Sequence, residues 1–195
     1  MSWMASTSVT LEHVTLEGLL LAAGAGSRMG IPKATVHDDD GTSWLVRAVS
    51  TLRDGGCEAV TVVLGAAAAE ARALLPSGVE VVVADDWADG MSASLQVGLE
   101  TLTTGAAAVI SLVDLPDVTA EVVRRLVAAG AGPADLARAT YDGRPGHPVL
   151  IGRDHWAGVV EAATGDRGAR DYLATHEVNS VECGDLATGR DRDRR

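Results

Sequence analysis

Four short runs of small and branched apolar residues alternate with segments of helical spacing, and this alternation restricts the possible folds most strongly. The runs cover residues 18–22, 59–64, 79–84 and 106–113. They are nearly continuous in Val, Leu, Ile and Ala, which is typical of strands covered on both faces of a parallel sheet. Helices are predicted between and after them, at residues 43–54, 66–75, 92–102 and 119–129. The pattern predicts an α/β fold, a three-layer sandwich around a mostly parallel, Rossmann-like sheet.

The last third of the chain has a different pattern. Residues 139–141 and 147–151 flank a glycine- and proline-containing segment and predict a hairpin or a long turn. Helices at 154–163 and 167–176 and a short strand at 178–183 are expected to follow. The length of 195 residues favours one domain over residues 1–195, with an N-terminal extension at 1–16 and a frayed, charged tail at 187–195. The acidic run 38–40 is interpreted as a solvated loop.

The charge and cysteine content exclude several functional classes. The chain has 27 acidic and 16 basic residues and a net charge of −11, which disfavours nucleic acids and anionic membranes as partners. A small anionic ligand in a locally basic pocket stays compatible with this charge. Cys57 and Cys183 form no C-x-x-C pair, so that neither a disulfide framework nor a zinc cluster is expected. With no leader pattern and no apolar run of about 18 residues, a soluble cytoplasmic protein is predicted.

A glycine-rich segment directly follows the first predicted strand. Gly24, Gly26 and Gly30 let backbone amides approach a polyphosphate, and Arg28 and Lys33 add two cations. The spacing matches neither a P-loop nor a dinucleotide-binding fingerprint, because Pro32 precedes the lysine and Met29 occupies the place of the third glycine. The loop therefore predicts a nucleotide site of another kind at the carboxyl edge of the sheet.

The string L-A-A-G-A-G-S-R-M-G-I-P-K, residues 21–33, resembles the signature of the molybdenum cofactor cytidylyltransferase family within the nucleotidyltransferase superfamily. Four further segments are similar to that family in the same order: D-W-A-D-G-M-S-A-S-L at 86–95, V-D-L-P at 113–116, G-R-P-G-H-P at 143–148 and G-D-R-G-A-R at 165–170. Together they span nearly the whole chain, and the resemblance implies the nucleotidyltransferase version of the predicted sandwich.

The resemblance implies transfer of CMP from CTP to the phosphate of molybdopterin, with release of pyrophosphate. Arg28, Lys33 and Asp114 would be catalytic, with Asp114 and Asp193 holding Mg²⁺. His147 and Asp166 would contact the acceptor. The nucleotide would be bound by Leu21, Ala22, Ala23, Gly24, Gly26, Gly30 and Ser94. The family's terminal D-x-D-T-P-x-D is reduced here to Asp-Arg-Asp at 191–193, which weakens the second metal ligand.

Several alternatives stay open at this point. CTP is favoured over GTP because Ala23 stands where the guanylyltransferase branch carries glycine, and because of the Gly-His-Pro turn. A nicotinamide-nucleotide reductase of the nicotine blue oxidoreductase type is a second hypothesis. A third is a non-catalytic protein that delivers the molybdenum cofactor to a molybdoenzyme apoprotein. Structural roles are also possible: Asp114, Ser94 and Asp166 as helix caps, and His147 as a packed histidine.

Overall fold

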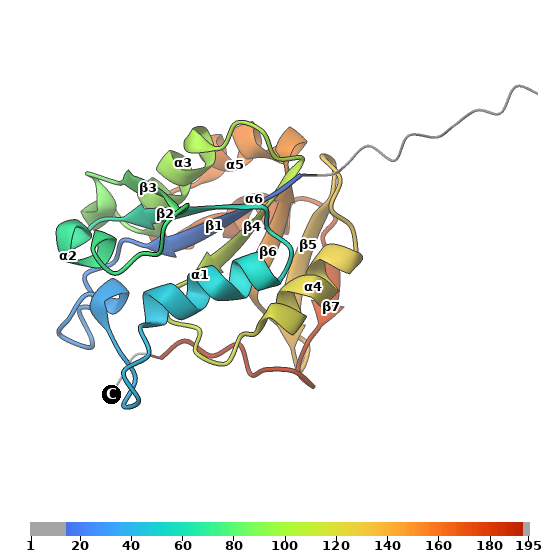
Figure 1. Ribbon diagram of the computed structural model, residues 1–195. Helices are drawn as coiled ribbons and strands as arrows, with labels where there is room; N and C mark the ends of the chain where they lie inside the picture. The colour runs from blue at the N-terminus through green and yellow to red at the C-terminus, as the bar shows by residue number, and fades with distance from the viewer. Residues whose placement is uncertain (1–14, 193–195) are drawn as a thin grey trace, which may run out of the picture.

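The computed structural model describes residues 15–192, which form one seven-stranded sheet with helices on both faces (Figure 1). The strand order is β3-β2-β1-β4-β6-β5-β7. β1 pairs in parallel with β2 and β4, β2 with β3, and β5 with β7, whereas β6 runs antiparallel to β4 and β5. The strands are β1 Leu16–Ala22, β2 Ala59–Leu64, β3 Glu80–Val83, β4 Ala107–Leu112, β5 Leu136–Tyr141, β6 Arg144–Gly152 and β7 Asn179–Glu182. The predicted α/β class and mostly parallel sheet are confirmed.

The helices divide between the two faces of the sheet. The α-helices are α1 Trp44–Asp54, α2 Ala68–Arg72, α3 Met91–Thr101, α4 Ala120–Ala128, α5 Trp156–Ala162 and α6 Arg170–Ala174. Short 3-10 turns occur at Lys33–Thr35, Trp87–Asp89, Arg153–His155 and Gly165–Arg167. Figure 1 shows α1 and α4 on one face and α3 and α5 on the other, and each face has its own buried apolar cluster. These two clusters make the three layers expected from the continuous apolar runs.

Some boundaries differ from the predictions for local reasons. The strand of the hairpin begins at Leu136, three residues before the predicted start. The final helix is shorter than predicted, because Gly165 and Gly168 adopt positive φ angles of 54° and 53° and delay its start to Arg170. The predicted helix at 66–75 is reduced to Ala68–Arg72.

The C-terminal segment 187–192 is tied to the body of the protein, unlike the frayed tail expected there. The amide and hydroxyl of Thr188 both donate to Asp117 Oδ2 at 2.6 Å. The amide of Arg192 donates to the main-chain oxygen of Asp114 at 2.9 Å. Its guanidinium donates to Asp38 Oδ1 at 2.9 Å and lies 5.6 Å from the ring centre of Trp44. The end of the described chain is thereby attached beside the carboxyl end of β4.

The acidic run 38–40 is only partly the solvated loop that was predicted. The Asp38 carboxylate pairs with Arg47 and accepts the indole N–H of Trp44 at 2.8 Å. Hydrogen bonds from Arg47 and then Trp44 lower its pKa. Asp38 is therefore an anchor for α1 and Arg192, whereas Asp39 and Asp40 are exposed.

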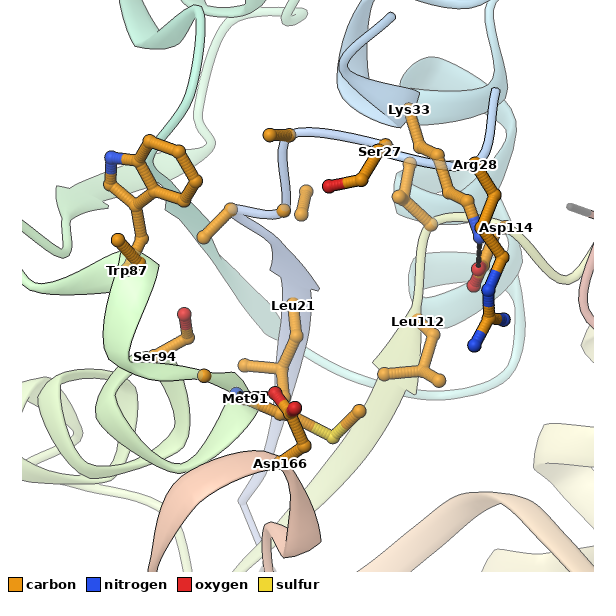
Figure 2. Close-up of a pocket in the computed structure, with 18 residues that line it drawn as sticks. Leu21, Ser27, Arg28, Lys33, Trp87, Met91, Ser94, Leu112, Asp114 and Asp166 are labelled. Atoms are coloured by element: carbon orange, nitrogen blue, oxygen red, sulfur yellow. Dashed lines mark hydrogen bonds and ion pairs between the residues drawn. The ribbon is translucent and has the colours of Figure 1, made fainter. Parts of the chain in front are cut away.

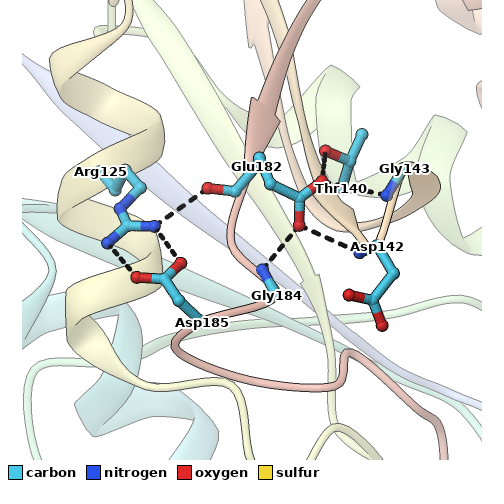
Figure 3. A network of polar contacts seen from close by, with 7 residues as sticks. All are labelled: Arg125, Thr140, Asp142, Gly143, Glu182, Gly184 and Asp185. Atoms are coloured by element: carbon cyan, nitrogen blue, oxygen red, sulfur yellow. Dashed lines mark hydrogen bonds and ion pairs between the residues drawn. The ribbon is translucent and has the colours of Figure 1, made fainter.

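The end of the β5–β6 hairpin is held by one carboxylate, that of Glu182 on β7 (Figure 3). It accepts the hydroxyl of Thr140 at 2.9 Å and the amides of Asp142, Gly143 and Gly184 at 2.8–3.0 Å. Hydrogen bonds from backbone amides, led by Gly143 and Gly184, lower the pKa of Glu182 to about 2. The hairpin that carries His147 is thus fixed to the edge of the sheet.

Replacing Glu182 with glutamine is expected to lower Tm at pH 7 by about 3 °C, because the amide cannot accept all four donors. The wild-type carboxylate is stabilising above its unfolded pKa of 4.5, and this stabilisation is lost as pH falls from 4.5 towards 2. Thermal unfolding at pH 7 and pH 3 should therefore show a clear Tm difference between the two proteins at pH 7 and a smaller one at pH 3. Glu177→Gln, at an exposed site, is the control. Equal pH dependence of Tm in the Glu182→Gln variant and wild type would contradict this assignment.

Candidate functional site

A cavity of about 540 Å³ opens at the carboxyl ends of β1 and β4 (Figure 2). This is the edge at which open α/β sheets bind their ligands. One wall is the loop that follows β1, the opposite wall is the start of α3, and the end of β4 contributes residues 112–114. The lining residues are Leu21, Ala22, Ala23, Gly24, Ala25, Gly26, Ser27, Arg28, Lys33, Trp87, Ala88, Gly90, Met91, Ser94, Leu112, Val113, Asp114 and Asp166.

The glycine-rich loop is a tight turn organised around Gly26. The main-chain oxygen of Gly26 accepts the amides of Met29 and Gly30, each at 2.8 Å. Gly26 has φ +62°, and a Cβ placed on it would lie 1.9 Å from the main-chain oxygen of Ile31. Within residues 15–192, the backbone amides of 24–27 donate no hydrogen bond to a protein acceptor. The loop therefore presents amide donors to an anion in the cavity.

Gly26→Ala is expected to destabilise the protein by about 2 kcal/mol or more, because the methyl group meets backbone in a conformation unfavourable for L-residues. Gly24→Ala is the matched control for stability, since a Cβ at Gly24 meets no atom within 4 Å. Chemical denaturation of both variants measures the difference in free energy of unfolding. Equal losses at the two positions would show that the turn is not constrained as described.

Lys33 and Asp114, which are 81 residues apart, form an ion pair in the wall of the cavity. The distance from Lys33 Nζ to Asp114 Oδ2 is 2.5 Å, and the two side chains are 17% and 12% exposed. Lys33 starts the 3-10 turn after Pro32, and Asp114 follows the end of β4. Asp114 is not engaged as a helix cap, because its carboxylate meets Lys33 and Thr119 occupies the N-cap position of α4.

The structure places the other predicted site residues in the main cavity, in a second cavity or in neither. Arg28 lines the main cavity, as do the six predicted nucleotide-binding residues other than Gly30. Gly30 belongs to the loop but does not line the cavity, and His147 lies in a second, smaller cavity. Asp193 lies outside the described residues.

The start of α3 is packed against the segment that carries Asp166. Asp166 Oδ1 accepts the amide of Met91 in a long hydrogen bond of 3.4 Å, so that it caps α3 rather than its own segment. The buried hydroxyl of Ser92 accepts the amide of Gly168 at 3.1 Å. Gly90, with φ +114°, has no room for a Cβ, which would lie 2.6 Å from the carbonyl carbon of Gly165. Ser94, three residues after Met91 in α3, is buried and also lines the cavity.

His147 faces the second cavity, of about 190 Å³, which shares Leu21, Met91 and Asp166 with the first. Its main-chain oxygen accepts the hydroxyl of Tyr141 at 2.7 Å. Burial, and then the charges of Arg138 and Arg170, lower the pKa of His147 to about 4. The imidazole is therefore neutral near pH 7.

The sequence analysis did not assign a role to several residues of the cavity walls. Trp87, Met91 and Leu112 contribute apolar surface to different parts of the main cavity (Figure 2). Trp87 could have been noticed as one of only four tryptophans, placed just after a strand. Arg138 of the second cavity also carried a signal, a cation in a strand of otherwise small and apolar residues.

The carboxylate in the wall of the main cavity is compatible with a divalent cation that arrives with a nucleotide. Mg²⁺ is generally held by one or two protein carboxylates together with phosphate oxygens and water. Residues 15–192 contain no group of three or more potential ligand side chains that would form a complete protein cage. Asp114, beside the amide-rich loop, fits a site in which the protein supplies one or two carboxylates and the nucleotide supplies phosphate oxygens.

Within residues 15–192, no helix has the length and apolarity required to span a membrane.

Comparison with known proteins identifies the relatives of this chain. Residues 18–181 match the family model described as the MobA-like NTP transferase domain. The chain is 34% identical to the nicotine blue oxidoreductase of Paenarthrobacter nicotinovorans, over 90% of this chain and 91% of that protein. It is 30% identical to a probable molybdenum cofactor guanylyltransferase of Mycobacterium ulcerans, over 90% and 88% of the two chains.

Solved structures agree with this assignment. An Rv0371c homologue from Mycobacterium sp. strain JC1 superposes with a TM-score of 0.79 at 27% identity, covering 92% of this chain and 90% of that one. A manganese complex of Rv0371c from Mycobacterium tuberculosis has a TM-score of 0.72 at 25% identity, covering 87% and 88%.

Proposed function

This chain belongs to the MobA-like NTP transferase domain family, and we propose on that basis that it transfers CMP from CTP to the phosphate of molybdopterin. An oxygen of the phosphate monoester would attack the α-phosphorus of CTP, and the bond from the α-phosphorus to the bridging oxygen of the β-phosphate would break. Pyrophosphate leaves with the electron pair of that bond. Such a reaction depends on positioning and charge neutralisation more than on covalent participation of the protein.

The observation that carries the proposal is the Lys33–Asp114 ion pair beside the amides of the glycine-rich loop. A triphosphate needs cations to offset its charge, and the loop supplies Lys33 and Arg28 together with backbone donors. The carboxylate of Asp114, which contacts Lys33, suits a divalent cation. A cavity with these three elements is adapted to phosphoryl-group transfer.

The metal is proposed to be Mg²⁺, held by Asp114 and Asp193. When bound, Mg²⁺ would neutralise charge on the triphosphate oxygens. The manganese complex of the similar Rv0371c supports divalent metal use in this family. Arg192, the residue before Asp193, donates its amide to the main-chain oxygen of Asp114, which supports the pairing of the two acids.

The proposed base is cytosine, and the reason is space. Ala23 is 3% exposed and lines the cavity beside Gly24, so that its methyl group occupies volume that a glycine would leave open. A pyrimidine needs less room than a purine. The relatives named as guanylyltransferases make GTP the nucleotide to compare directly.

A reductase is the second candidate, because the relative that shares 34% identity over 90% of this chain is named a nicotine blue oxidoreductase. A reductase would bind a nicotinamide nucleotide in the same cavity and transfer a hydride to a pigment. It would not require Asp114 as a metal ligand. The two candidates therefore differ in their nucleotide, their metal dependence and their product.

The test is to incubate the full chain with CTP, GTP or NADPH, with and without Mg²⁺ and molybdopterin, and to follow pyrophosphate and NADPH absorbance. The proposal predicts pyrophosphate release that needs CTP, metal and molybdopterin together. NADPH oxidation with nicotine blue, and no pyrophosphate, would replace it with the reductase. Tight molybdopterin binding with neither reaction would replace it with a delivery role towards a molybdoenzyme apoprotein.

A further inference from the structure

The second cavity is built from three elements that lie far apart in the sequence. Arg138 comes from β5, His147 from β6 and Arg170 from the first position of α6. Arg138 is paired with Val149 across the antiparallel ladder, so that Arg138 and His147 lie on the same face of the hairpin, the face of α3 and α5. The rest of the cavity is largely apolar.

Arg138 is a half-buried cation in the wall of the second cavity. Within residues 15–192, its guanidinium makes no hydrogen bond or ion pair. Burial, followed by the positive charge of Arg170, lowers the pKa of Arg138. Partial burial removes water from the Arg138 guanidinium, and the like charge of Arg170 repels it, so that both effects raise the free energy of the charged side chain. An anion bound between the two arginines would lower this free energy.

Two acidic side chains near the second cavity, Asp166 and Asp171, contact groups other than Arg138. Asp166 lines both cavities, and its Oδ1 accepts the amide of Met91. Asp171 pairs with Arg167 in an exposed i,i+4 ion pair. Neither contact neutralises Arg138, and the excess of positive charge in this cavity contrasts with the net charge of −11 of the whole chain.

The imidazole of His147 completes the donor set. Being neutral near pH 7, it carries one N–H that can donate to an oxyanion without adding a further positive charge to the cavity, which Arg167 also lines. Two guanidiniums and one imidazole N–H are the donors that recognise phosphate and carboxylate groups in proteins.

We propose that this second cavity is an oxyanion subsite, in which Arg138 and Arg170 bind a phosphate or carboxylate group of the second substrate. Its volume of about 190 Å³ is below the roughly 300 Å³ of a complete small-molecule site, so that it holds one group of a larger molecule. Leu21, Met91 and Asp166 line both cavities, so that a group held in the second cavity lies next to the main cavity, where the nucleotide binds. That the molecule is the acceptor rests on the proposed function; the anion site itself does not.

The binding test uses methyl phosphate and acetate as probes and the NMR signal of the His147 ring as the local reporter. It is carried out in the Lys33→Ala background, in order to suppress binding in the main cavity. Saturable shifts of the His147 signal are expected, and Arg138→Met or Arg170→Met should weaken binding at least tenfold. Arg144→Met, on the same hairpin but outside both cavities, is the matched control and should bind as the parent does. The stronger of the two probes identifies phosphate or carboxylate as the group.

Arg170 is exposed, so that Arg170→Met tests the site even where Arg138→Met fails to fold. Unchanged affinity in Arg170→Met and in a folded Arg138→Met, or no saturable shift with either probe, would overturn the subsite. With transfer activity established, Arg138→Met should raise the KM for the acceptor at least tenfold and leave the KM for CTP unchanged. An unchanged acceptor KM would overturn the link to the second substrate. Absence of transfer in wild type, with anion binding intact, would refute the proposed function alone.

Discussion

Lys33→Ala is expected to lower the rate of nucleotidyl transfer by about 10³-fold, within the range seen when one charged group that stabilises a phosphoryl-transfer transition state is removed. The substitution removes the cation that contacts Asp114 and leaves that carboxylate facing the triphosphate. Both the stabilising charge and the electrostatic balance of the cavity are thereby lost. The measurement is kcat and KM from pyrophosphate release at saturating Mg²⁺.

The same change should also lower stability. The Lys33–Asp114 pair is largely buried, and breaking it leaves the Asp114 carboxylate without this cation, so the Tm of Lys33→Ala should fall below that of wild type while the protein still folds. Arg124→Ala is the matched control, because it removes the cation of the exposed Arg124–Glu121 pair on α4 without touching the cavity. A Lys33→Ala enzyme with a kcat close to that of Arg124→Ala would exclude Lys33 from catalysis.

Asp114→Asn is expected to lower kcat by about 10²-fold and to raise the Mg²⁺ concentration for half-maximal activity by about tenfold, because a neutral amide is a poor ligand for a hard divalent cation. The amide is nearly isosteric with the carboxylate, and its oxygen can still accept from Lys33 Nζ. The loss should therefore concern the metal rather than the position of the lysine. The measurement is a Mg²⁺ titration of initial rates at saturating CTP.

The control for this titration is Asp54→Asn, which removes one negative charge from an exposed site at the end of α1. It leaves the cavity untouched and should leave the Mg²⁺ midpoint unchanged. An equally unchanged midpoint in Asp114→Asn would mean that Asp114 serves only to orient Lys33.

The parallel part of the sheet could be predicted because its strands are continuous apolar runs. Residues 18–22 and 60–64 are buried on both faces, and the sequence contains no polar alternation that would suggest another arrangement. The shared location of the glycine-rich loop and Asp114 followed from the same argument, since the carboxyl ends of parallel strands meet at one edge. The direct Lys33–Asp114 contact depends on the path of the loop and could not be predicted.

The antiparallel part and the C-terminal segment were harder to predict. That Arg138 and His147 line one cavity depends on the register of β5 and β6 and on the bulge after Arg138, neither of which has a local signal. The segment 187–192 has no apolar periodicity. It is held by long-range polar contacts of Thr188 and Arg192, which become apparent only when Asp117, Asp38 and Trp44 are placed.

The most direct test of the central claim is to follow labelled phosphorus from CTP. With ³²P at the α-position, the label should appear in a molybdopterin cytosine dinucleotide, and with ³²P at the γ-position it should appear in pyrophosphate, both only when molybdopterin and Mg²⁺ are present. An α-label that stays on CTP or is released as free CMP, with molybdopterin unmodified, would contradict nucleotidyl transfer by this protein.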